Sequence, residues 1–317
     1  MRITLALASL AVAALPAAAQ QTPSPNNGRP YYYAFVPKPA PVPYTGVNRP
    51  IWRLDQVLAA NKGKASWRQQ VIATPRFSGE WIQMARGERT RPQFYGDDRV
   101  MWVVWGGQIR FHIDGQQPFV ASKGFLVQVP FRTAYWMETV GDEPALRFEV
   151  THAGIKPSFP AGETDKAAPP GYIKVTAPNT YASDTYGKDN KLSIDFFKDI
   201  VAANIVPPVD DRYLANDGDT MSAILRGPGT PTPPPSNRGH FHNGYDEFWV
   251  ILEGTCEYLI EGQKELITAR PGDVVLATPN RWHRAAWAGT GMATRLAFNA
   301  RTGMFHTFGE DAEGRQR

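Results

Sequence analysis

Cysteine is nearly absent from this chain of 317 residues, since Cys256 is the only one. A single cysteine excludes an internal disulfide. It stands in residues 255–260, a largely apolar run that predicts a strand, and nothing in the sequence places a base beside it. We therefore expect Cys256 to be a small buried side chain and not a nucleophile.

Charge of one sign and long apolar runs are also scarce. The formal net charge is +4 without any Lys/Arg cluster, so nucleic acid is not expected as a partner. The main apolar run, residues 3–15, follows Arg2 and leads through an alanine-rich stretch to Gln20. This order is typical of a secretory signal, and the run is too short to span a bilayer. We expect cleavage near Ala19 and Gln20, which predicts a secreted or periplasmic protein without a membrane anchor.

Helical periodicity is rare, whereas turn residues are abundant. The sequence has 28 prolines, 28 glycines and 12% aromatic residues, a composition that favours short strands joined by turns. The clearest helix candidates are residues 52–60 and 193–204. Strand-like runs separated by turns recur in the first half, at residues 77–84, 100–105, 109–113, 125–129 and 145–151. The pattern predicts an all-β protein, and its length is enough for two domains.

One stretch, residues 239–254, combines side chains that bind metals. His240 and His242 are two residues apart, so in a strand they project from the same face. The Asn-Gly pair that follows tolerates the positive φ of a tight turn. Glu247 can then open a second strand that faces the same interior.

The fourth expected ligand is His283. A Pro-Gly turn leads into a strand, and a second turn at residues 279–282 delivers His283 at the head of the next strand. Three neutral imidazoles and one carboxylate suit a single divalent transition metal, which here means Mn, Fe, Cu, Ni or Zn.

The spacing of these residues resembles a known family. The pattern His-x-His-x4-Glu-x6-Gly, followed by Pro-Gly and by a proline with a histidine four residues on, is similar to the two-part motif of the cupin superfamily. The resemblance implies an all-β fold of two cupin-type (jelly-roll) β-barrels in tandem with a few short helices. The domains expected after the signal peptide of residues 1–20 are a Pro-rich arm with a short helix at 21–65, an N-terminal barrel lacking metal ligands at 66–170, a metal-binding barrel at 171–308 and a mobile tail at 309–317.

An internal repeat supports the tandem arrangement. Gly107 and Gly254, like Gly115 and Gly262, are 147 residues apart. In that register, with a two-residue insertion before the last position, the four ligand positions are occupied in the first half by Gln93, Tyr95, Val100 and Ala134. We therefore expect the N-terminal barrel to bind no metal and to have a structural or substrate-shaping role.

Two further histidines are not expected to be ligands. His112 matches Leu259 in the repeat, and His306 lies beyond the last expected strand of the second barrel.

The resemblance implies a secreted, metal-dependent bicupin enzyme. Oxidoreductase chemistry is favoured, either a dioxygenase or a redox decarboxylase acting on a small organic acid, enol or aromatic compound. The alternatives are a non-redox lyase or isomerase of a sugar or uronic acid, and a non-enzymatic protein that binds a sugar or a metal. Exposed strand edges and the long arm favour a homodimer.

Several side chains are expected to act on the substrate. Glu247 is interpreted either as a lasting ligand or as a base. Arg281 is a candidate catalytic residue, because a guanidinium can pair with an anionic substrate. Trp249 follows Glu247 by two residues and shares its inward face. The expected substrate-binding residues are Trp249, Arg226, Trp287 and Tyr258.

Overall fold

The structure is a computed structural model that describes residues 35–160, 168–179, 186–230, 239–300 and 304–308. The predicted signal segment and the predicted mobile tail lie outside the described residues. No helix among the described residues is long and apolar enough to cross a membrane.

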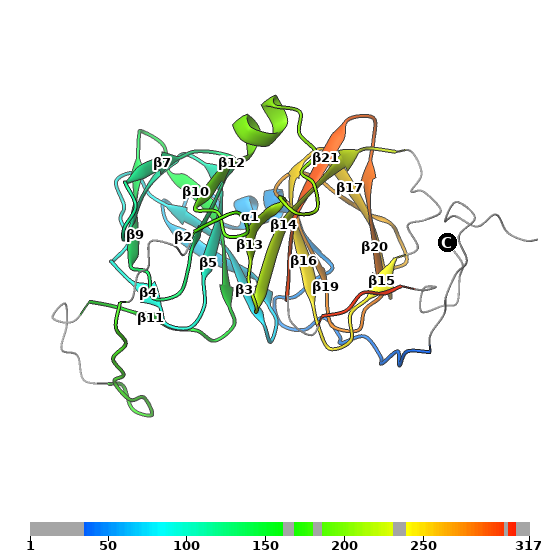
Figure 1. Ribbon diagram of the computed structural model, residues 1–317, viewed down its shortest axis with the longest axis horizontal. Coiled ribbons are helices and arrows are strands. Elements are labelled where there is room, and N and C mark those ends of the chain that lie inside the picture. Colours follow the sequence, from blue (N-terminus) through cyan, green and yellow to red (C-terminus); the bar gives the residue numbers. More distant parts are fainter. Residues whose placement is uncertain (1–34, 161–167, 180–185, 231–238, 301–303, 309–317) are drawn as a thin grey trace, which may run out of the picture. The chain divides into compact units, whose positions relative to one another are not determined.

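The N-terminal half is built from a large and a small sheet (Figure 1). The large sheet has the order β12-β8-β5-β10-β3-β2, and the small sheet has the order β7-β6-β9. The large sheet contains β12 (Ser193–Asp195), β8 (Phe125–Val129), β5 (Val100–Gly106), β10 (Ala145–His152), β3 (Phe77–Met84) and β2 (Trp67–Ala73). The small sheet contains β7 (Phe119–Ala121), β6 (Gln108–Ile113) and β9 (Tyr135–Val140), and a separate pair is formed by β11 (Pro157–Ser158) and β4 (Phe94–Tyr95).

The C-terminal half repeats this arrangement. Its large sheet has the order β1-β19-β16-β21-β14-β13, and its small sheet has the order β18-β17-β20-β15-β22. The large sheet contains β1 (Ile51–Trp52), β19 (Val274–Ala277), β16 (Glu247–Glu253), β21 (Met292–Ala300), β14 (Thr220–Pro228) and β13 (Tyr213–Asn216). The small sheet contains β18 (Ile267–Ala269), β17 (Thr255–Ile260), β20 (His283–Ala288), β15 (His240–Phe241) and β22 (Thr307–Phe308).

Three apolar clusters hold these sheets together. One fills the space between the two sheets of the N-terminal half and includes Trp102 and Phe111, and a second does the same in the C-terminal half with Trp249 and Tyr258. The third and largest joins the outer faces of the two large sheets, where Phe77 of β3 packs edge-on against Phe248 of β16 at 5.5 Å between ring centroids. The two halves therefore share a core, because alternate residues of each central strand face opposite clusters.

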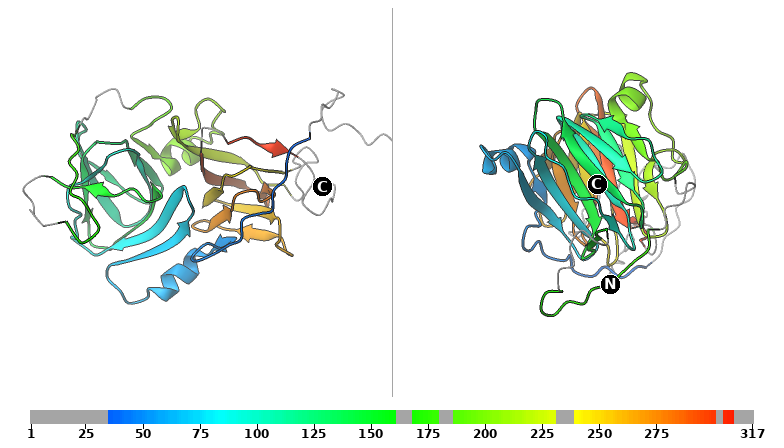
Figure 2. Two further views of the ribbon diagram at one scale, coloured as in Figure 1. Left: turned by 90° about the horizontal axis from the view of Figure 1, so that it is seen from below. Right: turned by 90° about the vertical axis from the view of Figure 1, so that its left-hand side faces the viewer.

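Each half gives one strand to the other. β1 precedes the N-terminal half in sequence but pairs with β19 of the C-terminal half, and Figure 2 shows this blue segment beside the orange strands. β12 follows the N-terminal strands and pairs with β8, before the chain enters the C-terminal half. The two exchanged strands lie outside the ranges predicted from the sequence for the barrels that they join.

The two helix predictions were partly right. The first predicted helix begins two residues late, as α1 (Leu54–Ala60), because the preceding residues are used by β1. The second begins as strand β12 and continues as a π-helix, η2 (Phe196–Ala202), whose backbone at Lys198 donates to the side chain of Asp195. Pairing with β8 overrides helical spacing at the start of this segment.

The N-terminal arm lies on the C-terminal half. The backbone N–H of Val42 donates to the carbonyl of Pro279 at 3.0 Å, and Lys38 Nζ donates to the carbonyl of Asn280 at 2.7 Å. Tyr44 adds a hydrogen bond from its hydroxyl to the carbonyl of Leu276 at 2.7 Å. The arm therefore covers the turn that leads to His283.

Candidate metal centre

Neighbouring strands bring the predicted ligands together. His240 in β15 lies directly opposite His283, the first residue of β20. His242 follows β15, and Glu247 opens β16. The turn between them has a positive φ of 76° at Gly244, as the Asn-Gly pair predicted. This turn returns Glu247 to the face that the histidines share.

The ligand atoms of His240, His242, Glu247 and His283 all lie within 4.8 Å of one another. Glu247 Oε2 is 3.1 Å from His242 Nε2, 3.2 Å from His283 Nε2 and 3.8 Å from His240 Nε2. His242 and His283 are each 1% exposed. The cluster is thus compact and largely closed to water.

Hydrogen bonds from outside the cluster orient its side chains. His242 Nδ1 lies 3.1 Å from the carbonyl of Phe305, and His283 Nδ1 lies 3.0 Å from the carbonyl of Arg281. A carbonyl only accepts, so both Nδ1 atoms carry the proton and both Nε2 atoms present a lone pair. Asn299 Nδ2 donates to Glu247 Oε1 at 3.2 Å and leaves Oε2 directed at the histidines.

This donor set fits a cation. Two Nε2 lone pairs and a carboxylate oxygen converge at about 3 Å with no proton assigned to lie between them. Such an arrangement of acceptors is unfavourable by itself and becomes favourable when a positive charge is shared among them. Three nitrogen donors and one oxygen donor, held by partners outside the cluster, are the pattern of a site for a divalent transition metal.

The pKa values are consistent with a deprotonated site. Burial, aided by the nearby His283, lowers the pKa of His240 to about 3. Burial by itself would raise the pKa of Glu247, but its contacts with His240, His242 and His283 bring that pKa well below its ordinary value. His240 and Glu247 are therefore in the protonation states that metal binding requires at neutral pH.

His306 lies beside the cluster, although it was not expected there. Its ring centroid is 4.6 Å from that of His240 and 4.7 Å from that of His242. Strand β22 brings it there by pairing with β15, a contact that no periodicity in so short a segment could indicate. Its ligand atoms are not among the four that converge, so His306 lies next to the site and not within it.

Side chains of the C-terminal interior extend from the cluster. Trp249 packs against the ring of His283 at 5.2 Å and against that of Tyr258 at 5.0 Å. Burial raises the pKa of the Tyr258 hydroxyl, which lies within electrostatic reach of both Glu247 and Arg295. The structure therefore places Trp249 beside His283 and Tyr258 behind Trp249, and their role in substrate binding stays a prediction.

Arg295 was not identified from the sequence. It is 9% exposed, and its Nε and Nη1 find no hydrogen-bond partner among the described residues. Arg295 alternates with Ala297 and Asn299 along β21, so the three share the face that lines the interior. An arginine within a largely apolar strand was the signal available in the sequence.

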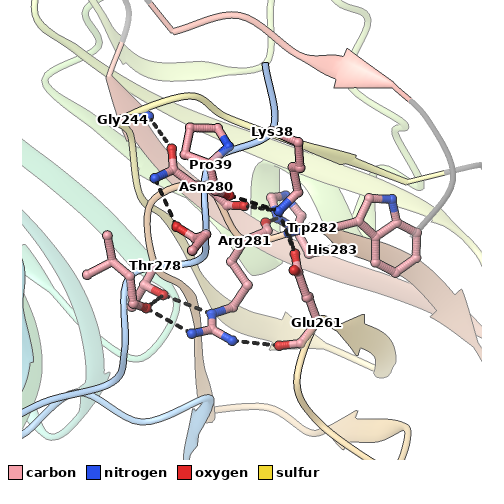
Figure 3. Close-up of polar contacts among 11 residues, drawn as sticks. Lys38, Pro39, Gly244, Glu261, Thr278, Asn280, Arg281, Trp282 and His283 are labelled. Atoms are coloured by element: carbon pink, nitrogen blue, oxygen red, sulfur yellow. Dashed lines mark hydrogen bonds and ion pairs between the residues drawn. The ribbon is translucent and has the colours of Figure 1, made fainter. Parts of the chain in front are cut away.

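Arg281 has a structural position instead of the predicted catalytic one. Its Nε donates to Thr278 Oγ1 at 2.8 Å, its Nη1 to the carbonyl of Glu261 at 2.6 Å and its Nη2 to the carbonyl of Val42 at 2.8 Å (Figure 3). The guanidinium thus ties the arm to the turn before His283. We assign Arg281 a role in positioning this turn.

Arg226 and Trp287 are also engaged by neighbours. Arg226 Nε donates to Glu253 Oε2 at 2.9 Å, and this buried pair leaves the guanidinium committed to the protein. The ring of Trp287 lies 5.2 Å from the guanidinium of Arg295, and its Nε1 donates to the carbonyl of Leu225 at 3.4 Å. Trp287 therefore borders the interior, whereas the contacts of Arg226 do not support its predicted role in substrate binding.

The corresponding positions of the N-terminal half contain no metal-binding set. Gln93 forms a β-bridge with Tyr135, which matches the pairing of His240 with His283 in the C-terminal half. Val100 lies opposite Thr151, which matches the pairing of Glu247 with Asn299. The prediction of Ala134 as the counterpart of His283 was wrong by one residue. Tyr135 pairs with Ile113 as His283 pairs with Ile260, so the insertion is one residue and not two.

Comparison with known proteins agrees with this architecture. The family model for the cupin domain matches residues 227–298, which include all four residues of the cluster. A search of the curated proteins finds no match.

Solved structures show the same fold. A variant of salicylate 1,2-dioxygenase from Pseudoaminobacter salicylatoxidans is 12% identical, with a TM-score of 0.59 over 81% of this chain and 87% of that chain. The same enzyme with gentisate gives 13% identity and a TM-score of 0.56 over 81% and 84%. A cupin 2 conserved barrel domain protein from Leptotrichia buccalis is 11% identical, with a TM-score of 0.50 over 79% and 95%. At these identities the likeness concerns the fold.

Proposed function

We propose that this chain, a cupin by fold with its metal cluster in the C-terminal half, is a metal-dependent oxidoreductase. Its substrate would be a small organic acid, enol or aromatic compound, and its reaction the insertion of oxygen. The observation that carries the proposal is the buried set of three histidines and one glutamate whose ligand atoms converge. The likeness to salicylate 1,2-dioxygenase across most of both chains supports it.

The bound metal would polarise a substrate oxygen and supply redox chemistry. Both oxygens of Glu247 are engaged, one by histidines and the other by Asn299, so the geometry favours a lasting ligand over a mobile base. Trp249 and Tyr258 would present an aromatic wall to the substrate.

Arg295 is the group best placed to recognise an acidic substrate. Its buried guanidinium keeps two donor nitrogens without a partner among the described residues, an arrangement that is costly unless a ligand supplies an acceptor. A carboxylate matches the planar fork of a guanidinium. Recognition by Arg295 replaces the roles predicted for Arg226 and Arg281.

The proposal is tested by measuring metal content and oxygen consumption together. Protein loaded with iron, copper or manganese under anaerobic conditions is mixed with small hydroxylated aromatic acids, enols and aliphatic acids. We expect oxygen uptake that requires both metal and substrate and that disappears in His242→Ala. Turnover of a sugar or uronic acid by the zinc or nickel form without oxygen would instead identify a lyase or isomerase.

Secretion is proposed from the N-terminal segment. Cell fractionation and N-terminal sequencing are expected to find a periplasmic or extracellular protein that begins near Gln20. An uncleaved cytoplasmic protein would contradict this.

A further inference from the structure

A cavity in the N-terminal half lies beside the positions that correspond to the metal ligands. Its volume is about 360 Å³, and its lining includes Tyr95, Glu149 and Thr151. By the strand registers, Tyr95 is the counterpart of His242 and Thr151 that of Asn299. Tyr95 is the one ligand counterpart that lines the cavity, so the cavity adjoins the equivalent of the metal cluster and does not coincide with it. This volume lies within the range of small-molecule sites.

The floor of this cavity is a buried polar network. Glu149, 8% exposed, accepts hydrogen bonds from Trp102 Nε1 at 2.8 Å and from Arg68 Nη2 at 3.1 Å. Arg147 Nη2 approaches the same carboxylate at 3.5 Å. Two guanidinium groups, which are permanently charged, thus compensate the charge of this buried carboxylate.

Groups of both signs surround the opening. Arg68 Nε also donates to Glu80 Oε2 at 2.8 Å, and Lys156 lies on the same lining. A single negative charge in the cavity would face two carboxylates, and a single positive charge would face Arg68 and Lys156. A neutral molecule with several hydroxyl groups can donate hydrogen bonds to the two carboxylates and accept hydrogen bonds from Arg68 and Lys156.

Other lining residues suit the same ligand. Gln70 and Ser78 add side-chain donors and acceptors, and Tyr95 adds aromatic surface for C–H groups. Burial, together with the charge of Glu149, raises the pKa of Tyr95 to about 12, so its hydroxyl stays protonated at neutral pH. The lining combines polar and aromatic surface, and on it the charges of Arg68 and Lys156 balance those of Glu80 and Glu149.

We propose that the N-terminal half is a binding site for a small neutral polyhydroxylated compound, such as a monosaccharide or polyol. The site is separate from the metal cluster and does not depend on the function proposed for it. The degenerate half would then be a second ligand-binding module and not only a scaffold.

Binding is tested with the full chain by saturation-transfer NMR and calorimetry. The probes are D-glucose, D-galactose, D-mannose, D-xylose, sorbitol and myo-inositol, with D-glucuronate and D-glucosamine as charged counterparts. We expect at least one neutral probe to bind more tightly than either charged one. Arg68→Ala, which removes a charged donor, and Gln70→Trp, which fills the mouth, are each expected to weaken binding by roughly ten-fold or more.

Two controls separate this site from other effects. Arg86→Ala removes the exposed salt bridge to Asp142, in the same half but outside the cavity, and should leave binding unchanged. His242→Ala, which impairs the metal cluster, should also leave it unchanged. The proposal is overturned if no neutral probe binds, if a charged probe binds best, or if Arg68→Ala and Gln70→Trp bind as the original protein does.

Discussion

At the scale of single residues, His242 is central to the metal site. It is 1% exposed, one ring nitrogen is held by the carbonyl of Phe305, and the other faces Glu247. Loss of a residue that only supports a ligand typically lowers metal affinity by about 10–100-fold. We expect His242→Ala to lower it by more than that, as measured by competition with a chromogenic chelator.

His112 provides the matched control for this substitution. It stacks on Trp136 at 3.6 Å in the N-terminal half, far in sequence from the cluster. His112→Ala should retain metal at the level of the original protein. Equal metal loss in both variants would contradict the assignment of the ligands.

The stability of the metal-free protein should depend on pH through His240. Its pKa is lowered from 6.5 to about 3 on folding, so between these values the unfolded chain binds more protons than the folded one. The free energy of unfolding must then fall as the pH falls through this range. We expect the decrease to be visible by denaturant titration between pH 6.5 and 4.5.

The range from pH 6.5 to 4.5 separates the contribution of His240 to stability from that of Glu247. The pKa of Glu247 is lowered from 4.5, so its own contribution is lost only below that value. His240→Ala should show a smaller decrease between pH 6.5 and 4.5. An identical pH dependence in both proteins would show that His240 is already protonated in the folded state or does not titrate there.

The ligands were predictable from the sequence because their geometry is local. His240 and His242 follow from strand periodicity, and Glu247 follows from the turn before it. The interpretation of Arg281 failed for the opposite reason. Its donors are used by the carbonyls of Val42 and Glu261, and a sequence does not show which distant backbone groups will meet a side chain.

At the scale of elements, β22 is the segment that lies next to the metal site. It pairs with β15, and the chain before it carries the carbonyl of Phe305 and the ring of His306 to the cluster. Removal of residues 304–317 should therefore speed metal dissociation, since it frees His242 Nδ1 and opens one side of the site. Stopped-flow transfer of the metal to a chelator measures this rate.

A shorter truncation is the control for this element. Removal of residues 309–317 keeps β22 and its pairing with β15, so the dissociation rate should remain unchanged. Equal acceleration in both truncations would assign the effect to the tail and not to the strand.

Strand predictions succeeded where a strand has its own alternation, as in the stretches observed as β3 and β6. They failed where pairing decides the conformation. Residues 193–195 have helical spacing with the segment that follows, yet they extend along β8 because an edge of that sheet is available to them. The two-residue strands β1 and β22 are too short to have a period.

At the scale of the molecule, the shared core should make the two halves unfold together. Phe248 of the C-terminal half is fully buried between Phe298, stacked at 4.8 Å, and Phe77 of the N-terminal half. Phe248→Ala is expected to cost about 3–5 kcal/mol. Scanning calorimetry of the metal-free variant should show a single transition that moves to lower temperature.

Tyr172→Ala is the corresponding surface control, since that side chain is 68% exposed. It should leave the transition within the error of the original protein. Two separate transitions in Phe248→Ala, with only one of them shifted, would mean that the halves are energetically independent. The tandem repeat was visible in the sequence, but the coupling between the two halves was not. This coupling depends on the faces of the two large sheets that point away from the interior of each half. The homodimer expected from the sequence stays a prediction.

The exchange of β1 and β12 makes the two halves inseparable along the chain. Each precedes one half in sequence and pairs with a strand of the other. A cut before β12 removes a strand from both halves, and a cut after it still leaves β1 on the fragment that lacks β19. No single cut therefore divides the chain into two pieces that each keep all of their own strands.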